Sequence, residues 1–351
     1  MNAPRQAVRL LMAVSIFAVG LMLVPRVSAD SGTTGMFSQA QGETGIDLSD
    51  LIDTDALGFL SPEQVRPWGQ LYADETERLL IASGDTVYVS FDKGRFVKPG
   101  DLFTVFDSSS ELEHPLSGKD VGYVISSLGR VVLKQEVKPN LFKAQIVECY
   151  HPMQVGNPVI PFEPVSPCLR LTSPERTASG DIKSAKITVV AARGLRQVIG
   201  QRSVVYMNDG QRQGIRRGNI FQILVRPQTD QPKEPGLPDQ VLGYLIILEA
   251  RPATSTGIVI TAKSEFYSGA TLKAVDLEQA LRKALSHFDM KYDDADIENR
   301  PIEVLDRLLQ KTGPHAEVPA AFILLSKMPR CRIEWTTESR TGMTLDPSTS
   351  F

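Results

Sequence analysis

The sequence predicts a mainly β fold: two tandem small β-barrel or β-sandwich modules, followed by a short α-helical C-terminal region. Two segments recur at one offset of 118 residues, Val87–Val89 as Val205–Met207 and Val97–Phe103 as Ile215–Phe221. Self-similarity at a fixed offset is typical of a duplicated structural unit. Apolar and polar residues alternate around Val87–Val89, with the period of two that a half-buried strand requires.

The first 29 residues have the pattern of a cleavable signal peptide. Arg5 and Arg9 precede an apolar run of 15 residues, 10–24, and residues 27–29 offer small side chains for cleavage. That run would span about 22 Å as a helix, at roughly 1.5 Å per residue, which is short of the roughly 30 Å of a bilayer core. We therefore predict an exported, periplasmic protein without a transmembrane segment after cleavage. Residues 30–57, rich in Gly, Ser, Thr and Asp, are predicted to form a flexible linker.

The first β-module is predicted over residues 58–163 and the second over residues 185–275. In each, Gly followed by Asp or Asn suits a tight turn that needs a positive φ or a side-chain cap before the next strand. A Gly-Tyr pair and a later Gly are aligned between the copies at offsets of 121 and 113. We interpret these residues as a structural turn signature: Gly100, Asp101, Gly122, Tyr123 and Gly156 in the first copy, and Gly218, Asn219, Gly243, Tyr244 and Gly269 in the second.

The remaining segments follow from composition and periodicity. Residues 164–184 are rich in Pro, Ser and Thr, which predicts a linker between the modules. Residues 276–330 are predicted to be helical, because apolar residues share one helical face after Asp276 and again after Pro301. Within that region we expect a final strand at Ala320–Ser326. Residues 331–351 are predicted to be a loose tail.

Charge and cysteine content exclude some classes of function. The chain has a formal net charge of −3, and removing the three arginines of residues 1–29 leaves 35 basic against 41 acidic residues. An acidic chain is a poor candidate for nucleic-acid binding, which needs phosphate neutralisation. The three cysteines are too few for a disulfide scaffold and lack metal-site spacing. In an oxidising compartment their odd number leaves at least one free thiol or an intermolecular bridge, and Cys149–Cys168 is the pairing to test.

No catalytic, metal or cofactor motif is found, so the sequence predicts a protein that is not an enzyme and has no cofactor. His114 and His151 each precede a proline and are interpreted as turn residues. Exposed aromatic residues could stack on sugars, although packing within the sheets is the more economical interpretation. The aromatic residues concerned are Trp68, Tyr88, Tyr123, Tyr206 and Tyr244.

The repeats resemble the β-module of bacterial envelope proteins that often carry a peptidoglycan-binding LysM domain. They are also similar to the C-terminal domain of the flagellar assembly protein T. The resemblance rests on Val97–Phe106, His114–Lys119 and Gly122-Tyr123 in the first copy, and on Val241–Tyr244 and Ser255–Val259 in the second. It covers residues 58–275 and implies an envelope location with a scaffolding or binding role. No LysM segment is present in this sequence.

The leading hypothesis is therefore a non-enzymatic envelope protein that binds peptidoglycan, or proteins of an apparatus that spans the envelope. A second hypothesis is an assembly factor that oligomerises through its C-terminal helices. A third is a polysaccharide-active enzyme that uses loop carboxylates such as Glu111, Glu113 or Asp120.

Overall fold

The computed structural model describes residues 43–74, 80–173, 176–177, 180–181, 187–225, 238–287, 290–312 and 318–333. The chain from Gly42 onward forms one compact unit. The predicted signal peptide, the first part of the predicted linker and the end of the predicted tail lie outside the described residues. Among the residues that are described, no helix has the length and apolar character needed to cross a bilayer.

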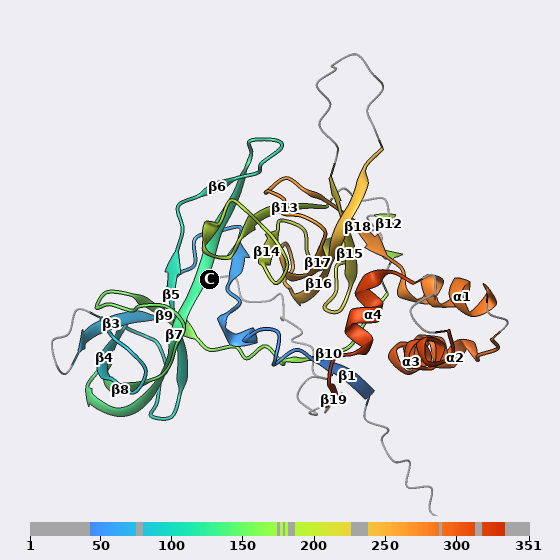
Figure 1. The fold of residues 1–351 in the computed structure, drawn as a ribbon. Helices are drawn as coiled ribbons and strands as arrows, with labels where there is room; N and C mark the ends of the chain where they lie inside the picture. The colour runs from blue at the N-terminus through green and yellow to red at the C-terminus, as the bar shows by residue number, and fades with distance from the viewer. Residues whose placement is uncertain are drawn as a thin grey trace, which may run out of the picture. The chain divides into compact units, whose positions relative to one another are not determined.

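Two closed six-stranded β-barrels dominate the fold, as predicted (Figure 1). The strands of the first barrel are β3 (Gly69–Asp74), β4 (Thr86–Phe91), β5 (Leu102–Ser108), β7 (Asp120–Lys138), β8 (Leu141–Cys149) and β9 (Pro158–Pro161). Those of the second are β13 (Ile187–Ala192), β14 (Val204–Met207), β15 (Ile220–Val225), β16 (Gln240–Ala250), β17 (Ser255–Ala262) and β18 (Thr271–Val275).

The barrels have the same strand order and the same turn chemistry. The order is β3-β4-β8-β7-β5-β9 in the first and β13-β14-β17-β16-β15-β18 in the second, so every strand has a counterpart. The side chain of Asp101 accepts a hydrogen bond from the N–H of Lys98 at 3.0 Å, and that of Asn219 accepts one from the N–H of Arg216 at 2.7 Å. The structure thus confirms the duplication predicted from the offset of 118 residues.

One part of the predicted alignment is wrong, namely the pairing of Gly122-Tyr123 with Gly243-Tyr244. In the first barrel Val105 lies opposite Gly129, and in the second its counterpart Ile223 lies opposite Gly243. The structural counterpart of Gly243 is therefore Gly129.

A close approach of two strands explains why glycine occupies both of these positions. A Cβ atom on Gly129 would lie 2.2 Å from the carbonyl oxygen of Glu148, and one on Gly243 would lie 2.0 Å from that of Thr261. Gly122 has a different role: with φ of 105° it lies in the N-terminal part of β7, beyond the barrel. There β7 pairs with β2 (Phe59–Ser61) and β6 (Leu112–Glu113).

The predicted linker is wrong for residues 43–57. They form β1 (Glu43–Asp47) and a 3-10 helix, η1 (Thr54–Ala56), and the side chains of Ile46 and Leu48 are fully buried. These apolar residues, hidden in a polar stretch, join the core that lies between the barrels and the C-terminal helices.

The predicted linker over residues 164–184 also contributes to this core. It contains β10 (Cys168–Leu169), β11 (Arg176–Thr177) and β12 (Gly180–Asp181), and Leu169 and Leu171 are buried. Three further short elements are the 3-10 helices η3 (Arg193–Leu195) and η4 (Gln211–Gln213) and the strand β19 (Arg330–Ile333).

In the part of the chain that the structure describes, four helices follow the second barrel: α1 (Leu277–His287), α2 (Asp294–Asn299), α3 (Pro301–Thr312) and α4 (Ala320–Ser326). The strand expected at Ala320–Ser326 is wrong, because Ala321, Phe322 and Leu325 follow helical spacing and are buried together. The apolar faces of α1 and α3 are buried in the same core.

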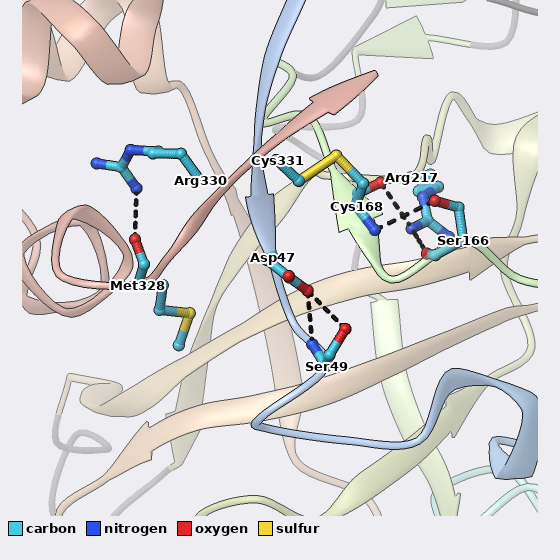
Figure 2. Close-up of a disulfide and its surroundings, with 8 residues drawn as sticks. All are labelled: Asp47, Ser49, Ser166, Cys168, Arg217, Met328, Arg330 and Cys331. Atoms are coloured by element: carbon cyan, nitrogen blue, oxygen red, sulfur yellow. Dashed lines mark hydrogen bonds between the residues drawn. A yellow bond between two sulfur atoms is a disulfide. The ribbon is translucent and has the colours of Figure 1, made fainter. Parts of the chain in front are cut away.

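A disulfide joins Cys168 in β10 to Cys331 in β19, with Cα atoms 5.8 Å apart (Figure 2). The predicted Cys149–Cys168 pair is therefore wrong, and Cys149 is a free thiol. The two bonded residues lie on the outer strands of a three-stranded sheet, β10-β1-β19. The first residues of the predicted tail are thus a strand rather than a loose segment.

Arg217 forms hydrogen bonds with the inter-module linker, residues 164–184, next to this disulfide. Its guanidinium donates to the carbonyl oxygens of Ser166 and Cys168, as Figure 2 shows, and to that of Leu248 at 2.7 Å. Burial lowers the pKa of Arg217. The linker, the second barrel and the C-terminal strand are consequently tied together at one place.

Candidate functional site

The two barrels meet along the segment that contains η1 and β2, residues 54–61, here termed the junction segment. The Tyr206 hydroxyl, in β14 of the second barrel, donates to the carbonyl oxygen of Leu57 at 2.7 Å. The Thr254 hydroxyl donates to the carbonyl oxygen of Leu60 at 2.8 Å. Because β2 also pairs with β7 of the first barrel, this segment is hydrogen-bonded to both barrels.

Replacing Tyr206 with Phe should loosen this junction. The tyrosine is fully buried, and burial raises the pKa of its hydroxyl, which keeps it protonated as a donor. Its loss leaves the buried carbonyl oxygen of Leu57 without that donor, at an expected cost of about 1–2 kcal/mol in the free energy of unfolding. Denaturant unfolding measures the loss. Tyr88→Phe, at the corresponding half-buried position of the first barrel, is the matched control and should change stability little.

A cavity of about 380 Å³ lies at the junction and is here termed the acidic pocket. Part of its wall is apolar, from the aromatic side chains of Phe59, Trp68 and Phe162. Its charged side chains are three carboxylates and one guanidinium, those of Asp55, Glu163, Glu249 and Arg251. An excess of carboxylates beside aromatic rings suits a ligand with a cationic group on an apolar body.

Glu249 and Arg251 form the charged centre of the acidic pocket. The Arg251 Nε lies 2.8 Å from the Glu249 Oε1, and its guanidinium lies 3.5 Å from the centre of the Phe59 ring. Arg251 also lies within 3.9 Å of the exposed carboxylate of Glu163. Burial raises the pKa of Glu249, although Arg251 acts in the opposite direction. The Glu249 carboxylate is therefore costly to ionise, as groups at binding sites often are.

A second carboxylate, that of Asp55, enters the same pocket from η1. It forms an ion pair with Arg130 of β7 at 2.9 Å, and the Arg130 guanidinium lies 4.9 Å from the centre of the Phe162 ring. Burial raises the pKa of Asp55, with Arg130 as the main opposing influence. Residues 54–61 thus supply a carboxylate to the cavity, and its ion pair with Arg130 links that carboxylate to the first barrel.

Ser127 of β7 adds an unsatisfied polar group to the wall. Its residue is 7% exposed, and its hydroxyl has no hydrogen-bond partner within the described part of the chain. Buried hydroxyls are normally hydrogen-bonded, so the Ser127 hydroxyl is a polar group of this wall that can still form a hydrogen bond.

The residues singled out from the sequence are scattered in the structure. The turn-signature residues lie outside the acidic pocket: Gly122 and Tyr123 are in the extension of β7 beyond the first barrel, and the others are in turns and strands of the barrels. The carboxylates of Glu111, Glu113 and Asp120 are exposed on the β6–β7 hairpin, with Glu113 opposite Asp120.

The aromatic and histidine residues singled out from the sequence also lie in different places. Tyr206 is fully buried and cannot stack on a sugar, whereas Trp68 lines the acidic pocket. His114 lies in a turn, where its Nδ1 accepts hydrogen bonds from the N–H groups of Leu116 and Ser117 at 3.2 and 3.3 Å.

Sequence reasoning missed the charged residues Asp55, Glu249 and Arg251. They come from η1 and from the end of β16, segments almost 200 residues apart that no motif connects. A scan against protein-family models and a search of curated proteins both find no match for this chain. The fold and the cavity define it as a duplicated two-barrel protein with a charged pocket between its barrels.

Proposed function

We propose that this chain is an exported, non-enzymatic protein of the cell envelope, in which the two barrels serve as one scaffold or binding module. Its ligand is peptidoglycan or a protein of an apparatus that spans the envelope. The observation that carries the proposal is the acidic pocket, which contains three carboxylates and aromatic side chains at a junction hydrogen-bonded to both barrels. Such a pocket receives an amino or guanidinium group carried on an apolar stem.

Two features support the envelope as the location. The first is the signal-peptide pattern of residues 1–29. The second is the Cys168–Cys331 disulfide, a bond that persists in oxidising compartments and is rare in the cytosol. The resemblance of the repeats to the β-module of envelope proteins favours the same location.

Binding through the pocket is favoured over assembly through the C-terminal helices. The apolar side chains that would join the helices of different copies are buried in the core of this chain, including Leu281 in α1, Leu308 in α3 and Phe322 in α4. The acidic pocket, in contrast, is open to a ligand.

Co-sedimentation with purified peptidoglycan sacculi tests the proposal directly. Residues 30–351 are incubated with sacculi across a salt series, together with Glu249→Gln and, as a charge-matched control, Glu111→Gln on the exposed hairpin. We expect the wild type and Glu111→Gln to pellet, with less protein in the pellet at high salt, and Glu249→Gln to pellet less. Failure of the wild type to pellet would falsify direct wall binding. Cross-linking in the periplasm would then identify the protein partner.

A further inference from the structure

A second cavity, of about 460 Å³, shares two lining residues, Leu57 and Ser127, with the acidic pocket. It is here termed the basic pocket. Its charged and titratable lining residues are Arg193, Arg196, Arg202, His151 and Asp107. Three guanidinium groups against one carboxylate give this cavity the opposite charge to the acidic pocket.

Among the residues that the structure describes, no acidic side chain forms an ion pair with the arginines of the basic pocket. Within the described residues, Arg196 and Arg202 have no ion pair and donate no side-chain hydrogen bond. Arg193 makes one long hydrogen bond, from its Nη1 to the carbonyl oxygen of Ala56 at 3.4 Å. Their donors are therefore available to a ligand.

The backbone at Arg202 shows that an arginine is held there at a conformational cost. Arg202 has φ of 63°, in the left-handed region that L-residues other than Asn and Asp rarely adopt. Its counterpart in the first barrel is Gly84, with φ of 90°. Both residues donate the same hydrogen bond, Gly84 to Ile146 at 2.9 Å and Arg202 to Val259 at 2.8 Å.

Comparison of the two barrels shows that the turn itself does not require an arginine side chain. The first barrel builds this turn with glycine, which adopts the conformation without strain. The second barrel builds the same turn with a strained arginine beside a cavity. Strain of this kind, when it is maintained, points to a function of the side chain.

We propose that the basic pocket is an oxyanion site, which binds a carboxylate or phosphate group of a ligand through Arg196 and Arg202. Guanidinium groups suit this role because their paired N–H donors match the oxygens of both anions. The unpartnered hydroxyl of Ser127 in the shared wall is a further donor at the site. This proposal concerns a different cavity from the proposed function and does not depend on it.

Isothermal titration of the full mature chain tests the site with defined probes. Inorganic phosphate represents a phosphate source. An N-acetylated tripeptide with a free C-terminal carboxylate represents a peptide source, and its C-terminal amide is the uncharged control. We expect binding of phosphate or of the free peptide, and no binding of the amide. The anion that binds more tightly identifies the source. Absence of binding by both anions overturns the proposal.

The decisive variant is Arg202→Gly, which installs the residue that the first barrel uses. It removes the charge and relieves the strain, so the melting temperature should not fall. Binding of the preferred anion should weaken about tenfold or more, as expected for loss of a charge-assisted hydrogen bond. Arg212→Gln, at an exposed position outside the pocket, should bind as the wild type does. Equal weakening in both variants would show a general charge effect and overturn the site.

Because the readouts differ, failure of this site is distinguishable from failure of the proposed function. Sedimentation with sacculi depends on Glu249, whereas titration with small anions depends on Arg202. If the chain binds small anions but not sacculi, the anion site stands and wall binding fails. If it binds sacculi but not small anions, wall binding stands and the anion site fails.

Discussion

Reduction of the Cys168–Cys331 disulfide is expected to cause the largest loss of stability that a single bond in this chain can produce. The bond joins residues 163 positions apart and so removes much of the conformational freedom of the unfolded chain. For closed loops of about 100 residues the expected contribution is roughly 4–5 kcal/mol. It also holds the outer strands of the β10-β1-β19 sheet, whose central strand precedes the junction segment in the chain. A scanning calorimetry experiment with and without reductant should show a fall in melting temperature on the order of 10 °C.

Cysteine variants separate this disulfide from other effects of the reductant. Cys331→Ser should reproduce the loss in the absence of reductant, whereas Cys149→Ser should unfold as the wild type does, because Cys149 is a free thiol. Peptide mapping under non-reducing conditions should recover Cys168 linked to Cys331. A Cys149–Cys168 peptide in its place would contradict the structure.

The second large effect is expected from Gly218→Ala, and the duplication supplies its control. Gly100 and Gly218 occupy corresponding turns with φ of 95° and 87°. Alanine at either position carries left-handed strain of about 1 kcal/mol or more. A Cβ atom at Gly100 meets nothing within 4 Å, but at Gly218 it would lie 1.9 Å from the carbonyl oxygen of Arg170.

The difference between the two variants measures how tightly the linker packs on the second barrel. Gly218→Ala must displace the chain around Arg170, which adds roughly 1–3 kcal/mol to the strain. We therefore expect denaturant unfolding to show a clearly larger destabilisation for Gly218→Ala than for Gly100→Ala. Equal losses would mean that residues 164–173 do not pack on this turn.

Much of the fold could be predicted because a duplicated barrel leaves its pattern in the sequence twice. The strands β5 and β15 follow the same turn at a constant offset, and the structure confirms this. The error at Gly122 arose because β7 extends beyond the barrel, whereas β16 begins at Gln240, only three residues before Gly243. The extension of β7 contains the pair Gly122-Tyr123, which is identical to Gly243-Tyr244 of β16. The residues that correspond to Gly243-Tyr244 in the structure are Gly129-Arg130, which do not match in sequence beyond the glycine.

The linkers were mispredicted because their partners are distant in the chain. Thr54 donates to the carbonyl oxygen of Val165, and Thr254 donates to that of Leu60. Local composition carries no information on such contacts, which decide whether a polar segment folds. The disulfide could not be chosen for the same reason, since the three cysteines allow three pairings.

The candidate site could not be predicted at all. Asp55 lies in a segment that reads as a linker, and Glu249 and Arg251 flank the end of a strand with no recognisable motif. Their significance depends on burial beside Phe59 and on the meeting of two barrels, both of which are properties of the folded chain.

The central claim is that the acidic pocket binds its ligand through ionised carboxylates, and the pH dependence of sedimentation with sacculi tests it most directly. Because the pKa of Glu249 is raised by burial, protonation on acidification begins at a higher pH than for an exposed glutamate. Between about pH 8 and pH 4, wild-type binding should therefore fall early, and the weaker binding of Glu249→Gln should lack that early fall. Superimposable pH profiles for the two proteins would contradict the assignment of this pocket as the binding site.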